Sequence, residues 1–446
     1  MTVLRDSATT GSSVTEWLGP FGLTVDVSDR RRACPHLGWA ASGGMHLSGL
    51  SGLAPVLAPG PVVPLLLDAL GVLGKVTAEL GARVSLDPSL VIGARAGSSS
   101  STRRGAVSVG GTTRLLPALD GWCAVSLARE DDRGAVPAIC QEPGGPDPWR
   151  QLAGAVRRSH AAAICERIRL FGIPAAVIGE VEPGATPVAV TRIASPRVGD
   201  LRGALVVDFS SLWAGPLCAK LLGAAGATVV KVESLTRPDG ARVGNRPFYD
   251  WLHAGQRSIA VDFSDHGARA RLAELVSGAD VVIEASRPRA LEQLGLAHHQ
   301  VALKPGVVWV SITGHGRRRP DLVAFGDDAA AAGGLVGVTP AGPVFCGDAI
   351  ADPLTGVVAA VGAAAGLRTG GGVLVDVSMA ATAAGFARAP LGCPGEHVVR
   401  REAGDWFLAC SADNRDQRVL PARRPRPVGR ASASGADNDW FRAAVR

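Results

Sequence analysis

The second half of the chain alternates short apolar runs with helix-like segments, beginning near residue 204. The first apolar run, Ala204–Phe209, is followed by an Ala- and Leu-rich segment from Pro216 to Ala225 and by a second apolar run, Ala227–Glu233. A strand, a helix and a strand within about 30 residues form a βαβ unit, in which the two strands are parallel.

Three more apolar runs, 258–262, 280–284 and 307–312, continue this rhythm, with a charged helix-like segment at 267–277. Apolar runs of this length are typical of parallel strands that are buried on both faces. The pattern predicts an α/β fold with a doubly wound, mostly parallel, Rossmann-like sheet, whose ligands bind at the carboxyl ends of the strands. The loop Ser210–Pro216 contains no Gly-x-Gly-x-x-Gly, which argues against a dinucleotide site.

Two stretches resemble linkers. One is 97–105, which contains four consecutive serines, and the other is 180–200, which is rich in Pro, Val and Thr. The second stretch divides the chain into two halves of similar length, so we expect a domain boundary there.

Composition narrows the class of protein. The chain has 446 residues and a formal charge of +6, and much of its arginine lies in loop-like segments. It contains neither a basic stripe nor a known nucleic-acid-binding module, so we expect no nucleic-acid partner. The apolar stretch 53–73 contains four prolines and Asp68 and would make a poor membrane helix. The polar N-terminus lacks an apolar signal core, so a cytoplasmic protein is expected.

The eight cysteines are scattered, and none forms a Cys-x-x-Cys pair. Their spacing therefore predicts neither a metal site nor a disulfide framework. Buried free thiols in a reducing compartment are the default expectation.

Five ordered runs in the second half carry a resemblance. The runs are 206–233 (with Ala214-Gly215-Pro216), 256–262, 279–296 (with Arg287-Pro288), 310–316 (with Gly314-His315-Gly316) and 351–378. Together they resemble the family III CoA-transferases, which include formyl-CoA transferase, carnitine CoA-transferase and α-methylacyl-CoA racemase. The resemblance implies an enzyme that moves CoA from an acyl-CoA thioester to a carboxylic acid, with CoA as part of the substrate and no further cofactor.

The resemblance also implies a catalytic residue, Asp352. In transferases of this family the nucleophile is an Asp that is followed four residues later by a Gly, here Gly356. Its carboxylate would form a mixed anhydride and then an aspartyl-CoA thioester. The local sequence equally fits a helix N-cap, because Pro353 favours the first helical turn. Asp348 is a nearby competitor, but no Gly follows it at the same interval.

Candidate CoA-binding residues also follow from the resemblance. Arg257 and Arg287 would meet phosphates, although each could equally be a solvated surface arginine. Gly356 would let the substrate approach closely. The remaining candidates are Ala214, Gly215, Pro216 and Gly314. The chain departs from the family pattern at Gln256, where Lys is usual, and at Ala285-Ser286, where Asn-Phe is frequent.

Two other functions remain open. A racemase of this family uses a His in a Gly-His-Asp run, and the corresponding stretch 324–334 contains no His. A catalytically silent CoA-ester binding subunit is the third hypothesis, and the departures at Gln256, Ala285 and Ser286 motivate it.

The first half resembles a degenerate family unit. We therefore expect three regions: residues 1–200 with a smaller α+β domain, 201–390 with the Rossmann-like active-site domain, and 391–446 with a shortened small domain and C-terminal segment. About Pro64 falls where Asp352 lies in the second unit, so we expect one active site per chain, with the first unit forming part of its wall. Family members form interlocked dimers, so a homodimer is expected. The C-terminal segment resembles that of the family, so we expect a complete chain.

Overall fold

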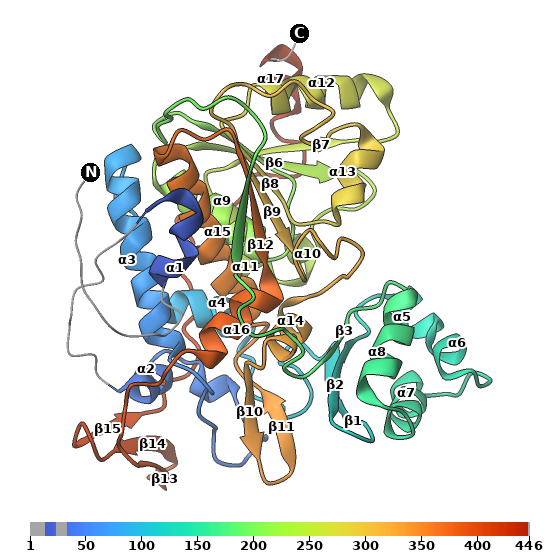
Figure 1. Ribbon diagram of the computed structural model, residues 1–446, viewed down its shortest axis with the longest axis vertical. Coiled ribbons are helices and arrows are strands. Elements are labelled where there is room, and N and C mark those ends of the chain that lie inside the picture. The colour runs from blue at the N-terminus through green and yellow to red at the C-terminus, as the bar shows by residue number, and fades with distance from the viewer. Residues whose placement is uncertain (1–13, 24–33, 445–446) are drawn as a thin grey trace.

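A central seven-stranded sheet organises the computed structural model, which describes residues 14–23 and 34–444 (Figure 1). In spatial order the strands are β4 (Val188–Arg192), β12 (Val373–Ser378), β9 (Val308–Thr313), β8 (Val281–Glu284), β5 (Leu205–Asp208), β6 (Thr228–Ser234) and β7 (Arg257–Val261). All neighbours are parallel except β4, which is antiparallel to β12. The α/β class and the large, mostly parallel sheet are therefore confirmed.

The order of the strands reverses between β5 and β8. From β5 the chain proceeds outward through β6 and β7, and from β8 it proceeds in the other direction through β9 and β12. This is the Rossmann order, and ligands of such sheets bind where the direction reverses, beyond the carboxyl ends of the strands. The loops after β5 and β8 flank that point.

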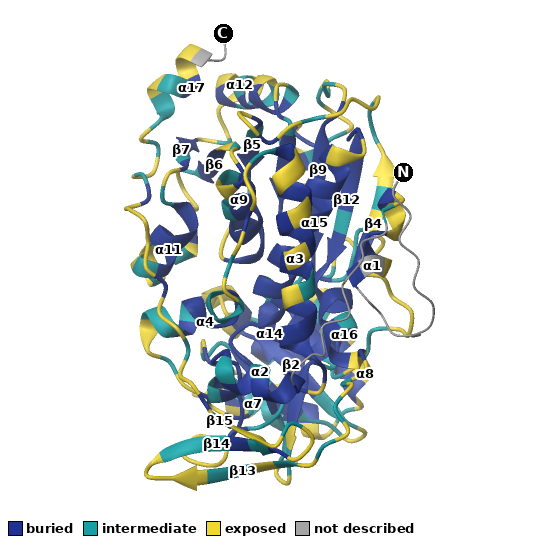
Figure 2. Cartoon of the chain, turned by 90° about the vertical axis from the view of Figure 1, so that its left-hand side faces the viewer, coloured by how far each residue is buried: buried dark blue, intermediate teal, exposed yellow. Residues whose placement is uncertain are grey.

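Alternate residues of the strands face two helical layers. Val206, Val308 and Val375 join one core cluster, whereas Val207 and Trp309 join another. The first layer contains α1 (Val14–Trp17), α3 (Val62–Leu80), α9 (Ala214–Ala224), α11 (Arg246–His253) and α15 (Ala351–Arg368). The second contains α12 (His266–Ser277), α13 (Pro288–Leu294) and α17 (Asn438–Ala444). The helix α15 is buried along most of its length (Figure 2), as expected for a helix with apolar residues on all sides.

A smaller α+β unit lies beside the sheet, at the lower right of Figure 1. Its antiparallel strands are β1 (Thr113–Pro117), β2 (Trp122–Ser126) and β3 (Ala175–Val177). Its helices are α5 (Glu130–Gly134), α6 (Val136–Cys140), α7 (Pro148–Arg157) and α8 (Ala161–Leu170). These elements share an apolar core of their own.

The remaining elements connect these bodies. They are the 3₁₀ helices Gly19–Phe21 and Met45–Leu47, α2 (Pro35–Ala41), α4 (Pro88–Ser99), α10 (Gly240–Gly244), α14 (Gly326–Ala332), α16 (Met379–Arg388), the hairpin β10 (Val336–Thr339) and β11 (Gly342–Phe345), and the antiparallel sheet β13 (His397–Glu402), β14 (Asp405–Cys410) and β15 (Arg415–Arg418). Within the described ranges, no helix is long and apolar enough to cross a membrane.

The two linker-like stretches are built into the structure. The stretch 180–200 contains β4, an edge strand of the main sheet, so the main body extends to both sides of residue 200. The stretch 97–105 contains the end of α4 and the buried Arg103, whose guanidinium donates to the carbonyls of His46, Leu50 and Leu53. The prediction of a linker there was wrong. Serines occur at helix ends as well as in loops, and the first serines of this run belong to the end of α4.

Candidate active site

Asp352 is the second residue of α15. Ile350 is the N-cap residue of this helix, so the alternative interpretation of Asp352 as the N-cap was wrong. A tight turn precedes the helix, with Ala349 in the left-handed region at φ 43°. The carboxylate therefore lies in the first turn, where the helix dipole favours negative charge.

Asp352 belongs to a cluster of three carboxylates around one guanidinium. Arg95, from α4, donates from Nε to Asp348 Oδ2 at 2.9 Å and from Nη2 to Asp348 Oδ1. The charges of Asp327 and Asp352 also act on Arg95 and, with Asp348, raise its pKa against the opposing effect of burial. Asp327 Oδ1 accepts from the backbone N–H of Ala349 at 2.9 Å, which fixes the turn before α15. We call these four residues the Asp/Arg cluster.

The cluster joins the two halves of the chain. Arg95 comes from the first half, and Ser48, also from the first half, accepts a hydrogen bond from the N–H of Gly347 at 2.9 Å. The sequence reasoning missed Arg95, because it lies 253 residues from Asp348 in the chain. Its one local signal was an arginine inside an apolar helix, Leu90 to Ala96.

Burial and neighbouring charge raise the pKa of Asp352 to about 7. The largest cause is burial, Asp327 and Asp348 add to it, and Arg95 and the N–H of Gly326 oppose it. Burial also raises the pKa of Asp327 to about 6. One guanidinium cannot neutralise three adjacent carboxylates, and the pKa values of Asp327 and Asp352 are both raised toward neutrality.

Exposure separates Asp352 from its neighbours. Asp327 and Asp348 are 6% and 2% exposed, whereas Asp352 is only half-buried. Both oxygens of Asp348 accept hydrogen bonds from Arg95. Asp352 is thus the most exposed of the three carboxylates in this cluster, and the competitor Asp348 is held in an ion pair.

The start of α9 lies close to the Asp/Arg cluster. The guanidinium of Arg95 lies 5.4 Å from the ring centroid of Trp213, the residue before Ala214. A Cβ on Gly356 would come within 2.6 Å of the Ala214 carbonyl oxygen, so Gly356 is a packing contact between α15 and α9. The prediction that Gly356 lets the substrate approach is therefore corrected, because the space beside it is filled by α9.

The other small candidates are also packing residues. Ala214, Gly215 and Pro216 are buried in the first turn of α9, where a Cβ on Gly215 would collide with Ser210. Gly314 is buried after β9, and a Cβ there would meet Ala324 at 2.7 Å. These residues shape the backbone at the carboxyl ends of β5 and β9.

A buried ionic network fixes the loop between β5 and α9. Lys231 in β6 is 1% exposed, and its Nζ lies 3.1 Å from Asp239 Oδ2 and donates to the carbonyl of Ser210. Asp239 accepts from the N–H of Leu212, which has a φ of 72°. The sequence reasoning missed this network, although Lys231 between the valines of an expected buried strand was a signal.

Arg257 and Arg287 have different surroundings. Arg257 Nη1 lies 3.1 Å from Asp437 Oδ1, and its guanidinium lies 4.5 Å from the ring centroid of Trp440, so this arginine anchors the segment that leads into α17. Arg287 follows β8 at the point where the strand order reverses. It is half-buried, and burial and the charges of Arg289 and Arg129 lower its pKa.

A groove of about 570 Å³ opens between the smaller α+β unit and the loop after β9. Its lining residues include three arginines, and the full set is Ala163, Glu166, Arg167, Arg169, Leu170, Arg319, Asp321 and Leu322. Asp321 lies 3.3 Å from Arg289, which is two residues after Arg287 in sequence. His315 is near Arg169 and Arg319, and burial and these charges lower its pKa to about 4.

Gln256, where the family pattern has Lys, is buried. Its Oε1 lies 2.7 Å from His253 Nδ1, and its Nε2 donates to the carbonyl of Leu252. Gln256 thus binds the end of α11 in the interior. Ala285 and Ser286 are exposed in the loop after β8.

The family model that matches this chain and two of its curated relatives are all described as CoA transferases. Residues 201–403 match the model of CoA-transferase family III. The chain is 29% identical over 272 residues to an acyl-CoA transferase of Fusarium pseudograminearum, covering 51% of this chain and 59% of that protein. It is 33% identical over 191 residues to a succinyl-CoA–D-citramalate CoA-transferase of Chloroflexus aurantiacus, covering 39% and 48%. The chain thus spans about half the length of these relatives.

Solved structures add little about the fold. A hypothetical protein of Mycobacterium tuberculosis is 26% identical, with coverage of 49% of this chain and 66% of that one, and the TM-score is 0.42.

Proposed function

Since residues 201–403 belong to CoA-transferase family III, we propose that this protein moves CoA from an acyl-CoA thioester to a carboxylic acid, with Asp352 as the nucleophile. The observation that carries the proposal is that Asp352 is the most exposed carboxylate of the Asp/Arg cluster, in the first turn of α15. The names of the two relatives above agree with this reaction class.

The proposed reaction has two symmetrical halves. A carboxylate oxygen of Asp352 attacks the thioester carbonyl, the C–S bond breaks, and CoA leaves as a thiolate from a mixed anhydride. The thiolate attacks the Asp352 carbonyl, which releases the donor acid as a carboxylate and leaves an aspartyl-CoA thioester. The acceptor carboxylate then repeats both steps in reverse and regenerates Asp352. Splitting the exchange in this way gives steps of similar energy.

Residues around Asp352 would control its charge. The reactive form is the carboxylate, and Arg95 and the N–H of Gly326 favour that form by lowering the pKa against burial. A partly dehydrated carboxylate is a better nucleophile than a hydrated one, provided that it remains ionised. Arg95 thus has the role of keeping Asp352 charged in a site with little water.

The CoA phosphates would bind near Arg287 and the groove. Arg287 lies where ligands of this fold bind, and Arg167 and Arg319 line the neighbouring groove, where Arg169 is already paired with Glu180. Guanidinium groups bind phosphates through paired hydrogen bonds. Arg257 is a weaker candidate, because Asp437 already pairs with it.

The test is to trap the adduct. The full-length protein is incubated with acyl-CoA donors, treated with hydroxylamine or borohydride, and digested for mass spectrometry. We expect a mass shift on the peptide that contains Asp352, and no transfer by Asp352→Ala. Asp200→Asn is the matched control, because Asp200 is an exposed carboxylate that caps a turn at Arg202. Transfer by a folded Asp352→Ala protein would refute the proposal.

The alternatives have different signatures. A racemase would exchange the α-proton of a 2-methylacyl-CoA with deuterated solvent, and a silent subunit would bind CoA esters without an adduct on Asp352. A homodimer stays a prediction, which the mass of the protein in solution would check.

A further inference from the structure

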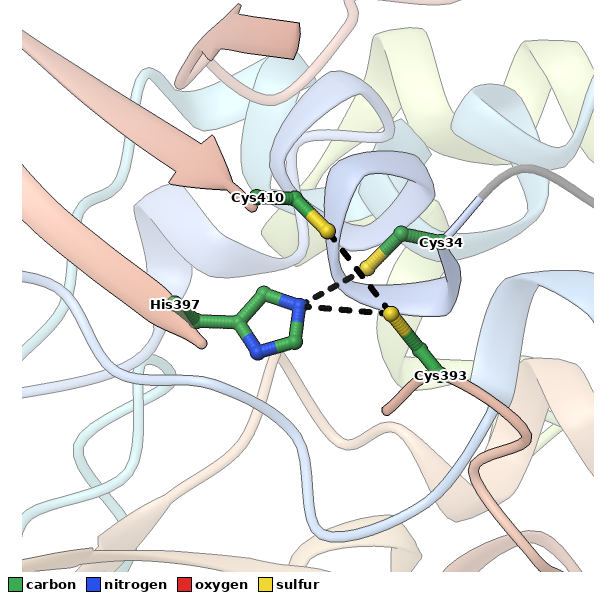
Figure 3. Close-up of side chains that lie close together, drawn as sticks. All are labelled: Cys34, Cys393, His397 and Cys410. Atoms are coloured by element: carbon green, nitrogen blue, oxygen red, sulfur yellow. Dashed lines mark hydrogen bonds between the residues drawn. The ribbon is translucent and has the colours of Figure 1, made fainter. Parts of the chain in front are cut away.

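Four side chains of the types that ligate metals converge from two distant regions of the sequence. Cys34, Cys393, His397 and Cys410 each offer one ligand atom, and these atoms all lie within 4.8 Å of one another. Figure 3 shows the three sulfur atoms and the imidazole ring pointing toward a common centre. We call these residues the Cys/His cluster, and we propose that it is a structural zinc site.

The distances fit one tetrahedral ion. With Zn–S bonds of about 2.3 Å, tetrahedral geometry places two sulfur atoms about 3.8 Å apart. Cys393 Sγ and Cys410 Sγ are 3.7 Å apart. His397 Nε2 lies 3.8 Å from Cys393 Sγ, close to the tetrahedral N···S edge of about 3.6 Å, and 2.9 Å from Cys34 Sγ, a hydrogen-bond distance that would lengthen when an ion binds.

The fold positions the four ligands from two regions of the chain. His397 and Cys410 face each other across the register of β13 and β14, and Cys393 lies in the loop that leads into β13. Cys34 immediately precedes α2, 363 residues before His397. Its backbone N–H donates to Asp413 Oδ2 at 2.8 Å, which holds Cys34 next to the turn after β14.

The ligand set indicates a structural role. Three thiolates and one imidazole complete a tetrahedral shell, which leaves no position for a substrate or a catalytic water. Soft thiolate ligands in a tetrahedral arrangement favour zinc over magnesium, calcium or manganese. Cys34 and Cys410 are buried, and the other two ligands are half-buried. The ion would tie the segment before α2 to the β13–β14 hairpin.

The spacing rules could not predict this cluster. No two of its cysteines form a Cys-x-x-Cys pair, and the only short spacing is Cys393 to His397. The proposal does not depend on CoA transfer, because no ligand of the Cys/His cluster belongs to the Asp/Arg cluster.

Metal content tests the proposal directly. The full-length protein is produced in zinc-containing medium and purified without chelators or metal resins, and zinc is measured by inductively coupled plasma mass spectrometry. We expect about one zinc per chain in the wild type and at least about a tenfold loss in Cys393→Ser. Cys140→Ser is the matched control, because Cys140 is another buried thiol but lies in the separate core of the smaller unit. The control should keep its zinc.

A second measurement uses only the wild-type protein, so it remains valid if a variant fails to fold. The metal-free wild-type protein is titrated with Co²⁺, which should give the absorption bands of tetrahedral thiolate coordination and lose them on addition of zinc. A wild-type protein that contains less than about a tenth of a zinc per chain and gives no such bands would overturn the proposal. A Cys393–Cys410 disulfide, seen as two fewer titratable thiols than the eight cysteines, would also overturn it.

Discussion

The Asp/Arg cluster and the Cys/His cluster are assembled in the same way and differ in their chemistry. Each joins the first part of the chain to the second, through Arg95 in one case and Cys34 in the other. The Asp/Arg cluster has more carboxylates than cations, and one carboxylate is half-buried. The Cys/His cluster has a closed set of ligands that face inward.

This difference fits the two proposals, a reactive site at the Asp/Arg cluster and a structural site at the Cys/His cluster. A carboxylate whose pKa is raised toward neutrality is typical of catalytic groups. A closed tetrahedral set instead stabilises the folded state, because ion binding and folding are coupled. The comparison therefore predicts opposite effects when each cluster is damaged.

The largest expected effect is that damage to the Asp/Arg cluster lowers activity, whereas damage to the Cys/His cluster lowers stability. Asp352→Asn should lower kcat/KM by at least about 10³-fold, because it removes the nucleophile, and should leave the melting temperature unchanged or slightly higher. Cys393→Ser should lower the melting temperature and leave the rate per folded molecule close to that of the wild type. Calorimetry and a CoA-transfer assay on both variants check this. Equal loss of activity in both folded variants would show that the clusters are not separable.

The next effect is the pH dependence of the reaction. The pKa of Asp352 is raised to about 7, and the carboxylate is the reactive form. The rate should therefore fall about tenfold for each pH unit below 7 and level off above it. Steady-state kcat/KM between pH 5 and 9 measures this profile. A flat profile between pH 5 and 8 would contradict the raised pKa.

Arg95→Gln sharpens the same measurement. Loss of the guanidinium removes a charge that lowers the pKa of Asp352, so the profile should move to higher pH and the rate at pH 7 should drop. Arg368→Gln is the control, because Arg368 pairs with Glu79 at the surface. An unshifted profile in Arg95→Gln would show that Arg95 has only a structural role.

Much of the main sheet was predictable from the sequence. Buried parallel strands read as continuous apolar runs, and β5 to β9 follow the predicted runs within one or two residues. The edge strand β4 was not predicted, because its residues are mostly exposed and resemble a loop in composition.

The site was only partly predictable. Asp352 came from a resemblance over a short motif, whereas Arg95 and Asp327 reach it through tertiary packing that no local pattern records. Gly356 and Arg257 match positions of the family pattern, but their nearest partners here are Ala214 and Asp437. A motif predicts which residue types stand at a position, and packing decides what each of them contacts.

The smallest effect concerns Asp328, a buried carboxyl group next to the Asp/Arg cluster. Burial is the main cause that raises its pKa to about 8. Its Oδ1 accepts from the N–H of Phe325 and the hydroxyl of Ser126, both at 3.0 Å. Within the described part of the chain, Oδ2 has no hydrogen-bond partner.

Asp328→Asn should therefore stabilise the protein in a pH-dependent way. The folded state binds this proton more tightly than the unfolded state, so the wild-type contribution to stability falls as the pH rises from about 4 to about 8. Asn keeps the acceptor and cannot ionise, so the variant should melt about 2–4 °C higher at pH 8 and show little difference at pH 4. Thermal unfolding at both pH values measures this. A variant that is less stable than the wild type at pH 8 would contradict this, because it would show that Asp328 stabilises the folded state as an anion and not as a neutral acid.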